Sequence, residues 1–220
     1  MSKQVLVKPV IFLLYGFPGS GKTFFSRQFA DEIKAAVVSD EQLRSQFYES
    51  PDYSSEQDKS VEHLLNYMSE QFLKVGSSVI LDANSSSQAK RRQYRELAAH
   101  SKAGVQLIWL QLDVESSFNR VVNRDRRTAD DKYAVQLDRT SFEDYISKMQ
   151  NPTPTEEYIV ISGKHAFSTQ KNAVVKKLFE RGLLNIENAS DRMVKPGLIN
   201  RVPNLNSGRV FQARRNIIIR

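Results

Sequence analysis

Eight consecutive residues carry the clearest chemical pattern in the sequence: Gly16, Phe17, Pro18, Gly19, Ser20, Gly21, Lys22 and Thr23. They fit G-x-x-x-x-G-K-[ST], a glycine-rich loop whose backbone N–H groups surround phosphate oxygens. Lys22 can reach the β- and γ-phosphates of a nucleoside triphosphate, and the Thr23 hydroxyl can ligate Mg²⁺. We call residues 16–23 the phosphate loop and predict that it binds ATP and Mg²⁺.

Asp40 and Arg44 are candidates for an acceptor site. Asp40 follows the short apolar run at residues 35–39, and Arg44 lies one helical turn later on the same side of a predicted helix. A carboxylate can accept a hydroxyl proton, and an arginine can orient an anionic group. The alternative is an ordinary salt bridge at a helix start. The preceding phosphate loop favours the functional interpretation.

Asp82 and a run of arginines could complete the site. Asp82 ends the apolar run at residues 78–82, where its carboxylate can hold the water shell of Mg²⁺, touch the acceptor, or simply cap the next helix. Residues 124–133, the lid, are dense in charge and lack periodicity. We predict that Arg124 and Arg127 close on the γ-phosphate, where an arginine stabilises developing charge. A solvated charge run is the alternative.

The elements that must position these residues follow from periodicity. Short apolar runs at residues 10–15, 35–39, 78–82, 105–112 and 158–163 predict strands. Helical spacing or capping residues predict helices between them, including helices beginning at Ser141 and Thr169. The helix after Ser87 is expected to be basic on its outer face, through Lys90, Arg91, Arg92 and Arg95. Such alternation predicts a doubly wound α/β fold with a five-stranded parallel sheet.

Composition excludes several classes of protein. The chain has 220 residues, 40% of them hydrophobic, and no cysteine, so disulfides and thiolate metal sites are excluded. No stretch approaches the length of apolar sequence that a membrane span needs, and the amino terminus lacks the pattern of a signal peptide. We therefore expect a soluble, cytoplasmic protein.

Positive charge is concentrated at the carboxyl-terminal end. Residues 190–220 hold seven basic side chains against Asp191 alone, and so supply +6 of the net charge of +7. We predict a kinase-type domain at residues 1–187 and a basic extension at residues 188–220. Such an extension can bind nucleic acid. A solvated or partner-docked extension is the plainer interpretation, because basic tails are common.

Several classes of phosphate-loop protein do not fit. The guanine-binding N-K-x-D, the D-x-x-G of GTPases and the L-S-G-G-Q of ABC proteins are all absent. Ala83 follows Asp82 where hydrolysing ATPases commonly carry a glutamate that orients water. A kinase remains the favoured class, and an NTP-hydrolysing regulatory protein whose tail binds a partner is the alternative.

Four stretches together resemble the P-loop kinase superfamily: the phosphate loop, Asp40–Arg44, Ile80–Asn84 and the arginines after Asn119. That superfamily includes AAA-type and zeta-toxin-like predicted kinases, gluconate kinase, chloramphenicol phosphotransferase and polynucleotide 5′-hydroxyl kinase. The likeness covers about residues 9–185 and is nearest to the polynucleotide kinase domain.

The resemblance implies an ATP-dependent kinase with assigned roles for matching residues. The counterpart of Asp40 is the general base, and the counterpart of Arg44 orients the acceptor phosphate. The counterparts of Lys22 and Thr23 serve ATP and Mg²⁺, and a lid arginine contacts the donor phosphates. The spacing from Asp40 to Arg44 is one residue longer than in polynucleotide kinases. The acceptor therefore stays open: a nucleic-acid 5′-hydroxyl, a small metabolite or a nucleotide sugar.

Overall fold

The phosphate loop follows the central strand of a parallel sheet. The computed structural model describes residues 6–184. Its sheet contains β1 (Val10–Tyr15), β2 (Ala36–Ser39), β3 (Val79–Asp82), β4 (Gly104–Gln111) and β5 (Tyr158–Ser162). The five strands are parallel and lie in the order β2-β3-β1-β4-β5, which confirms the predicted fold class. Strand β1 is buried along its whole length because strands flank it and helices cover it, which explains its uninterrupted apolar sequence.

Helices connect the strands: α1 (Lys22–Ile33), α2 (Asp40–Phe47), α3 (Ser55–Lys74), α4 (Gln88–His100), α5 (Val114–Val122), α6 (Arg139–Ser147), the 3₁₀ helix η1 (Pro154–Glu156) and α7 (Phe167–Glu180). The predicted start of α6 at Ser141 was wrong. The Asp138 carboxylate caps this helix by accepting a hydrogen bond of 2.7 Å from the Ser141 N–H, so Ser141 lies within the first turn. Helix α7 likewise begins at Phe167, two residues before the predicted position.

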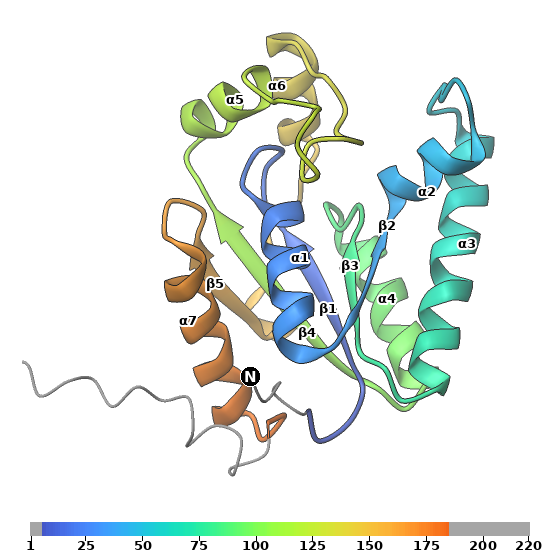
Figure 1. Ribbon diagram of the computed structural model, residues 1–220, viewed down its shortest axis with the longest axis vertical. Coiled ribbons are helices and arrows are strands. Elements are labelled where there is room, and N and C mark those ends of the chain that lie inside the picture. Colours follow the sequence, from blue (N-terminus) through green and yellow to red (C-terminus); the bar gives the residue numbers. More distant parts are fainter. Residues whose placement is uncertain (1–5, 185–220) are drawn as a thin grey trace, which may run out of the picture.

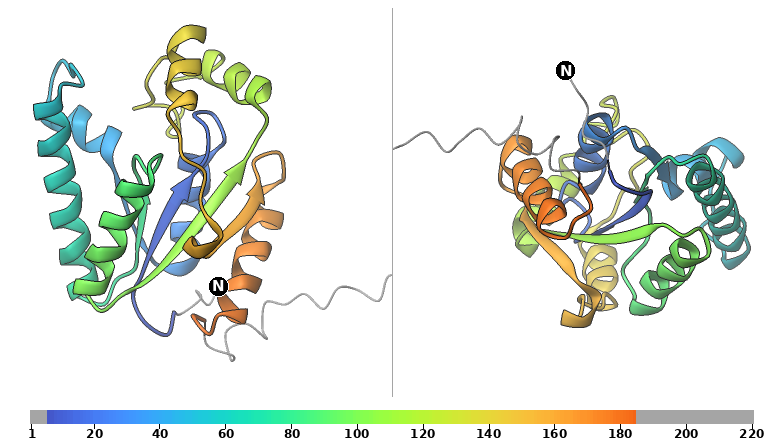
Figure 2. Two further views of the ribbon diagram at one scale, coloured as in Figure 1. Left: turned by 180° about the vertical axis from the view of Figure 1, so that it is seen from behind. Right: turned by 90° about the horizontal axis from the view of Figure 1, so that it is seen from below.

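The sheet separates two hydrophobic cores (Figures 1 and 2). Because side chains alternate along a strand, Phe12 faces the core made with α1 and α7, and Leu13 faces the core made with α2, α3 and α4. Phe12 meets Phe29 of α1 edge to face, with 5.5 Å between ring centroids. This double packing fixes the carboxyl end of β1 and hence the phosphate loop.

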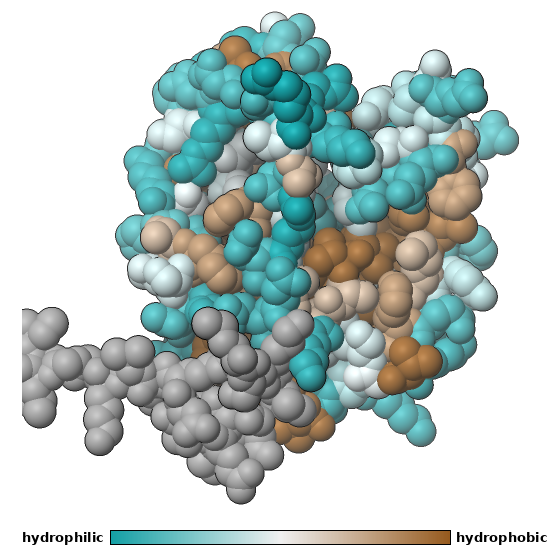
Figure 3. Space-filling model, in the orientation of Figure 1, coloured by the Kyte–Doolittle hydropathy of each residue, from teal (hydrophilic) through white to brown (hydrophobic). Residues whose placement is uncertain are grey.

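The hydropathy of the outer surface differs between the carboxyl ends of the strands and the β2 edge of the sheet. Around the carboxyl ends of the strands, α5, α6 and the segment between them present a mainly hydrophilic surface (Figure 3). An apolar patch lies between α1 and α3, over the edge strand β2. Within residues 6–184, no helix combines the length and hydrophobicity needed to cross a lipid bilayer.

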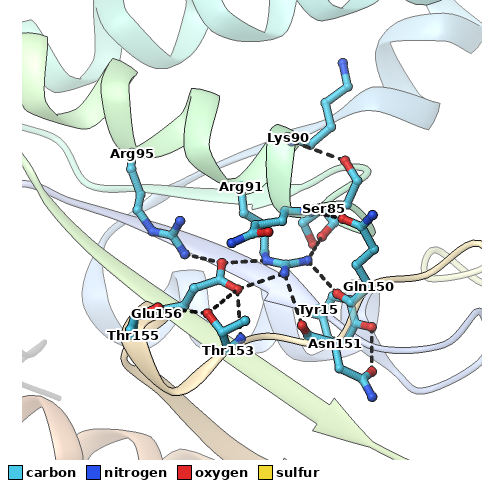
Figure 4. Close-up of polar contacts among 12 residues, drawn as sticks. Tyr15, Ser85, Lys90, Arg91, Arg95, Gln150, Asn151, Thr153, Thr155 and Glu156 are labelled. Atoms are coloured by element: carbon cyan, nitrogen blue, oxygen red, sulfur yellow. Dashed lines mark hydrogen bonds and ion pairs between the residues drawn. The ribbon is translucent and has the colours of Figure 1, made fainter.

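Arg91 corrects the prediction that the outer face of α4 is uniformly basic. Its side chain is 0% exposed, and its Nε and Nη2 donate to the two carboxylate oxygens of Glu156 at 2.8 and 2.9 Å (Figure 4). Arg95 pairs with the same carboxylate. Arg91 Nη1 also donates to the backbone carbonyls of Ser85 and Gln150, each at 2.9 Å. A distant acidic residue, which helical periodicity does not reveal, draws this arginine into the protein.

Two predictions concern residues outside the described range. The basic extension at residues 188–220 lies there, and the proposed boundary at residue 187 remains a prediction. At the limits of the described chain, Leu6 and Leu184 form an isolated antiparallel bridge. The amino-terminal approach to β1 is thus close to the end of the segment that follows α7.

Candidate active site

The phosphate loop joins β1 to α1 through a backbone that requires glycine. Gly19 and Gly21 have positive φ angles of 82° and 97°. A Cβ on Gly19 would lie 2.3 Å from the Ser117 carbonyl oxygen, so both conformation and space exclude a side chain there. The loop packs closely against α5 as a result, and α1 begins directly after it. Helix N-termini favour negatively charged ligands.

Lys22 is held over the phosphate loop. Its Nζ donates hydrogen bonds of 2.8 Å and 3.0 Å to the carbonyl oxygens of Gly16 and Phe17. Burial lowers the pKa of Lys22 to about 8; the nearby Asp82 carboxylate opposes this change, and Arg124 adds to it. The incoming phosphates of a nucleotide would supply the negative charge that this desolvated ammonium lacks.

Thr23 and Asp82 meet across the first turn of α1 and the end of β3. The Thr23 side chain lies near enough to the Asp82 carboxylate to lower its pKa, but burial has the larger effect and raises that pKa. A hydroxyl and a carboxylate are oxygen ligands of the kind that Mg²⁺ prefers. The described residues contain no group of three or more His, Cys, Asp or Glu that could hold a metal. Thr23 and Asp82 fit a Mg²⁺ that keeps waters and phosphate oxygens as its other ligands.

Asp40 lies beside this pair because β2 and β3 are neighbours. Its Oδ1 accepts a hydrogen bond from the Glu41 N–H at 2.8 Å, and its Oδ2 accepts one from the Asn84 N–H at 2.9 Å. Burial raises the pKa of Asp40 to about 7, and the Glu41 and Asp82 charges add to this, whereas the two N–H groups oppose it. A carboxylate with this pKa suits proton transfer near neutral pH.

Arg44 pairs with Asp58 and not with Asp40 in this structure. Its Nη2 lies 2.5 Å from Asp58 Oδ1 of α3, and its Cζ lies 4.7 Å from the centre of the Tyr53 ring. Only 6% of the residue is exposed. The predicted spacing on α2 is correct, but the acidic first turn of α3 provides the partner that sequence spacing alone did not identify.

The two predicted lid arginines have different positions. Arg124 lines a cavity of about 510 Å³ together with Lys22 and Thr23, and its Nη1 donates to the Val135 carbonyl at 2.7 Å. Arg127 is 91% exposed, and its guanidinium pairs with Asp125 two residues away. The structure therefore brings Arg124 to the phosphate loop and leaves Arg127 in solvent.

Three residues of the site had no signal in the sequence. The Tyr53 hydroxyl donates to Glu41 Oε2 at 3.1 Å. Burial, together with the Asp40 charge, raises the pKa of Tyr145 of α6 to about 12. Glu41 lies in the first turn of a helix, where acidic residues are common, so its position did not indicate a functional role. The two tyrosines lie in segments remote from Asp40 in sequence.

A central parallel strand, a phosphate loop and a lysine at a helix start define a P-loop nucleotide-binding fold of the kinase type. A family model described as "AAA domain" matches residues 11–152, and the chain belongs to this family. No curated protein sequence matches the chain.

Solved structures share the fold at low sequence identity. Kti12 of Chaetomium thermophilum, in complex with ADP-AlF3, is 18% identical, with a TM-score of 0.61 over 77% of this chain and 97% of that one. The APS kinase CysC of Mycobacterium tuberculosis, with AMPPNP and APS, is 15% identical, with a TM-score of 0.59 over 78% and 98%. A chain of the Pnkp1/Rnl/Hen1 RNA repair complex is 24% identical, with a TM-score of 0.55 over 64% and 44%.

Proposed function

We propose that the protein is a cytoplasmic, ATP-dependent kinase that transfers the γ-phosphoryl group of ATP to a hydroxyl of a nucleic acid or a small metabolite. The observation that carries this proposal is the position of Asp40. A carboxylate with a pKa of about 7 lies at the same sheet edge as Lys22 and the Thr23–Asp82 pair. Kti12, APS kinase and the RNA repair complex differ in their assemblies and bound ligands, so they do not select an acceptor.

The residues divide the work of such a transfer between donor and acceptor. Lys22 and the loop N–H groups would hold the phosphates, and Arg124 would neutralise charge on the γ-phosphoryl oxygens. Mg²⁺ held by Thr23 and Asp82 would offset the charge of the phosphate oxygens. Asp40 takes the acceptor's hydroxyl proton as that oxygen bonds to the γ-phosphorus. The bond between this phosphorus and the β–γ bridging oxygen breaks, and ADP leaves.

The alternative is ATP hydrolysis without transfer. It requires a group that orients water, and Ala83 occupies the position after Asp82. Asn84, the next residue, uses its N–H on Asp40 and its side-chain oxygen to accept from the Ser86 N–H at 3.0 Å. Neither residue offers a carboxylate to an attacking water, and so transfer is the better-supported reaction.

A labelled-phosphate assay with two variants tests the proposal. γ-Labelled ATP is offered with nucleosides, sugars, nucleotide sugars and 5′-hydroxyl DNA and RNA. Asp40→Asn should lower transfer by about 10²–10⁴-fold while ATP affinity stays within a few-fold, because Asp40 serves the acceptor. Asp31→Asn, on the exposed side of α1, is the matched control and should behave as wild type. Equal loss of ATP affinity and transfer in Asp40→Asn would instead assign Asp40 to the donor.

A further inference from the structure

We propose that the acceptor is a neutral polyhydroxy compound, a sugar or a nucleoside, that presents one hydroxyl to Asp40 and a second hydroxyl to Glu41. This inference rests on the proposed kinase function and specifies its substrate class. It differs from the expectation, implied by resemblance, that Arg44 orients a phosphate of the acceptor.

Glu41 is positioned to bind a hydroxyl next to the one that reacts. It adjoins Asp40 in the first turn of α2, and the Tyr53 hydroxyl fixes it by donating to its Oε2 at 3.1 Å. Each Asp40 oxygen accepts one backbone N–H bond, at 2.8 and 2.9 Å, and retains capacity for another donor. Hydroxyl groups donate short, strong hydrogen bonds to carboxylates, whereas a phosphate dianion has no proton to donate.

Electrostatics around Asp40 disfavour an acceptor phosphate. Asp40, Glu41 and Asp82 are close enough that Asp82 raises the pKa of both of the others. Mg²⁺ held by Thr23 and Asp82 would offset the Asp82 charge but would leave the charges of Asp40 and Glu41. A phosphate next to the reacting hydroxyl would therefore be repelled by the negative charges of the partly buried carboxylates.

The basic residues nearby offset these carboxylates only in part, although the Arg44 charge lowers the pKa of Glu41. Arg44 is committed to Asp58, and the Tyr53 ring covers its guanidinium. Arg124 lines the cavity on the donor side with Lys22, and its charge also reaches Glu41. Arg126 of the lid is exposed, and its charge reaches Tyr53. Arg44 and Arg124 are already paired with Asp58 and Asp131, and the charge of Arg126 is screened by solvent, so these arginines offset Asp40 and Glu41 only in part.

Two tyrosines provide surfaces suited to a sugar ring or a base. Tyr53, from the connection between α2 and α3, and Tyr145, from α6, are 45% and 36% exposed. Tyr53 donates a hydrogen bond to Glu41, and the charges of Asp40 and Glu41 reach the Tyr145 hydroxyl. Partly exposed aromatic rings beside a few fixed polar groups are typical of sites for small polar ligands.

Matched acceptor pairs with γ-labelled ATP test the inference. Each pair differs by one phosphate: uridine with 3′-UMP, and glucose with glucose 6-phosphate. A 5′-hydroxyl oligonucleotide is also offered, as the nucleic-acid acceptor. The best acceptor should be a neutral member, with kcat/KM at least about tenfold above its phosphorylated partner. A phosphorylated compound or the oligonucleotide as the best acceptor overturns the inference but leaves the kinase function standing. Transfer to no compound in the panel overturns both.

Glu41→Gln provides the second measurement. With the best neutral acceptor, this variant should raise the acceptor KM about tenfold and leave kcat and the ATP KM within a few-fold. It should also lower KM for the phosphorylated partner, because a negative charge is removed. Glu49→Gln, an exposed substitution just after α2, is the control and should change none of these values. An unchanged acceptor KM in Glu41→Gln, with Asp40→Asn still inactive, overturns the role of Glu41 while the kinase function stands.

Discussion

The backbone N–H of Asn84 donates a hydrogen bond of 2.9 Å to Asp40 Oδ2 and joins two segments that are 44 residues apart in sequence. Strands β2 and β3 are parallel neighbours with Ser39 opposite Asp82, so the residues that follow them emerge side by side. The bond holds Asp40 at the sheet edge beside Asp82. It also opposes the rise in the pKa of Asp40 that burial causes.

Phosphoryl transfer should depend on pH through Asp40. As a general base, Asp40 must be ionised, and its pKa is about 7. We expect kcat to rise with pH and to become constant about one pH unit above the pKa of Asp40. The pH–rate profile with saturating ATP and acceptor measures this. A flat profile between pH 5 and about 8 would contradict the assignment of Asp40 as the base.

The same pKa predicts an effect on stability. Asp40 has a folded-state pKa above its ordinary value of 3.8, so its contribution to stability is present below pH 3.8 and is lost as pH rises through about 7. Asp40→Asn should therefore raise the melting temperature more at about pH 8 than at about pH 4. Thermal unfolding at the two pH values, with Asp31→Asn as the control, distinguishes this from a pH-independent effect.

Lys22→Ala should abolish productive use of ATP. The pKa of Lys22 is about 8, so wild-type ATP affinity should fall as pH rises above that value, because the ammonium loses its proton. The variant should bind ATP weakly and show no such decline, with unfolding free energy changed by at most about 1 kcal/mol. Calorimetric ATP titrations across pH check both points. Lys59→Ala, on the exposed side of α3, should match wild type, and unchanged turnover in Lys22→Ala would remove the phosphate loop as the active site.

Arg91→Met should destabilise the fold strongly. The substitution leaves the buried Glu156 carboxylate without its main partner, which costs about 3–5 kcal/mol. Arg92→Met, one residue later, is the matched control: Arg92 is 76% exposed, and its loss should cost less than about 0.5 kcal/mol. Urea unfolding of both variants measures the difference.

The penalty of Arg91→Met should also depend on pH. Burial alone would raise the pKa of Glu156, but hydrogen bonds from Arg91 and Arg95 lower it to about 2. The stability that this ion pair supplies is therefore present above the ordinary value of 4.5 and is lost as pH falls toward about 2. The gap between wild type and variant should narrow over that range. A constant gap would indicate that lost packing, rather than charge, explains the penalty.

Deletion of residues 190–220 should weaken nucleic-acid binding if the basic extension contacts phosphates. Each lost contact should reduce the slope of log affinity against log salt by about 0.7–0.9. Transfer to a small acceptor should be unchanged, since the candidate catalytic residues lie before residue 132. A full-length variant with Arg209, Arg214, Arg215 and Arg220 changed to Gln separates charge from length. Binding and salt slope unchanged in both proteins would refute the prediction.

Local patterns in the sequence predict the fold class, which the structure confirms, and they propose the donor side of the site. An apolar run before a glycine-rich loop and a helical pattern after it are local features, and the backbone geometry of the loop follows from its glycines. Alternating strands and helices of this length leave few arrangements other than a parallel sheet covered on both faces. Lys22, Thr23 and Asp82 could be proposed because each lies at the end of an element whose place in the sheet was predictable.

The tertiary structure decided which charged residues pair with one another. Arg44 and Arg91 both have basic side chains at helical positions that periodicity assigns to an accessible face. Both side chains are buried in the structure, where Arg44 pairs with Asp58 and Arg91 with Glu156, 14 and 65 residues away. Likewise, Glu41 meets Tyr53 only after α2 and α3 pack together. Periodicity reports which face of an element is apolar, whereas ion pairing depends on distances between elements that only the packed chain establishes.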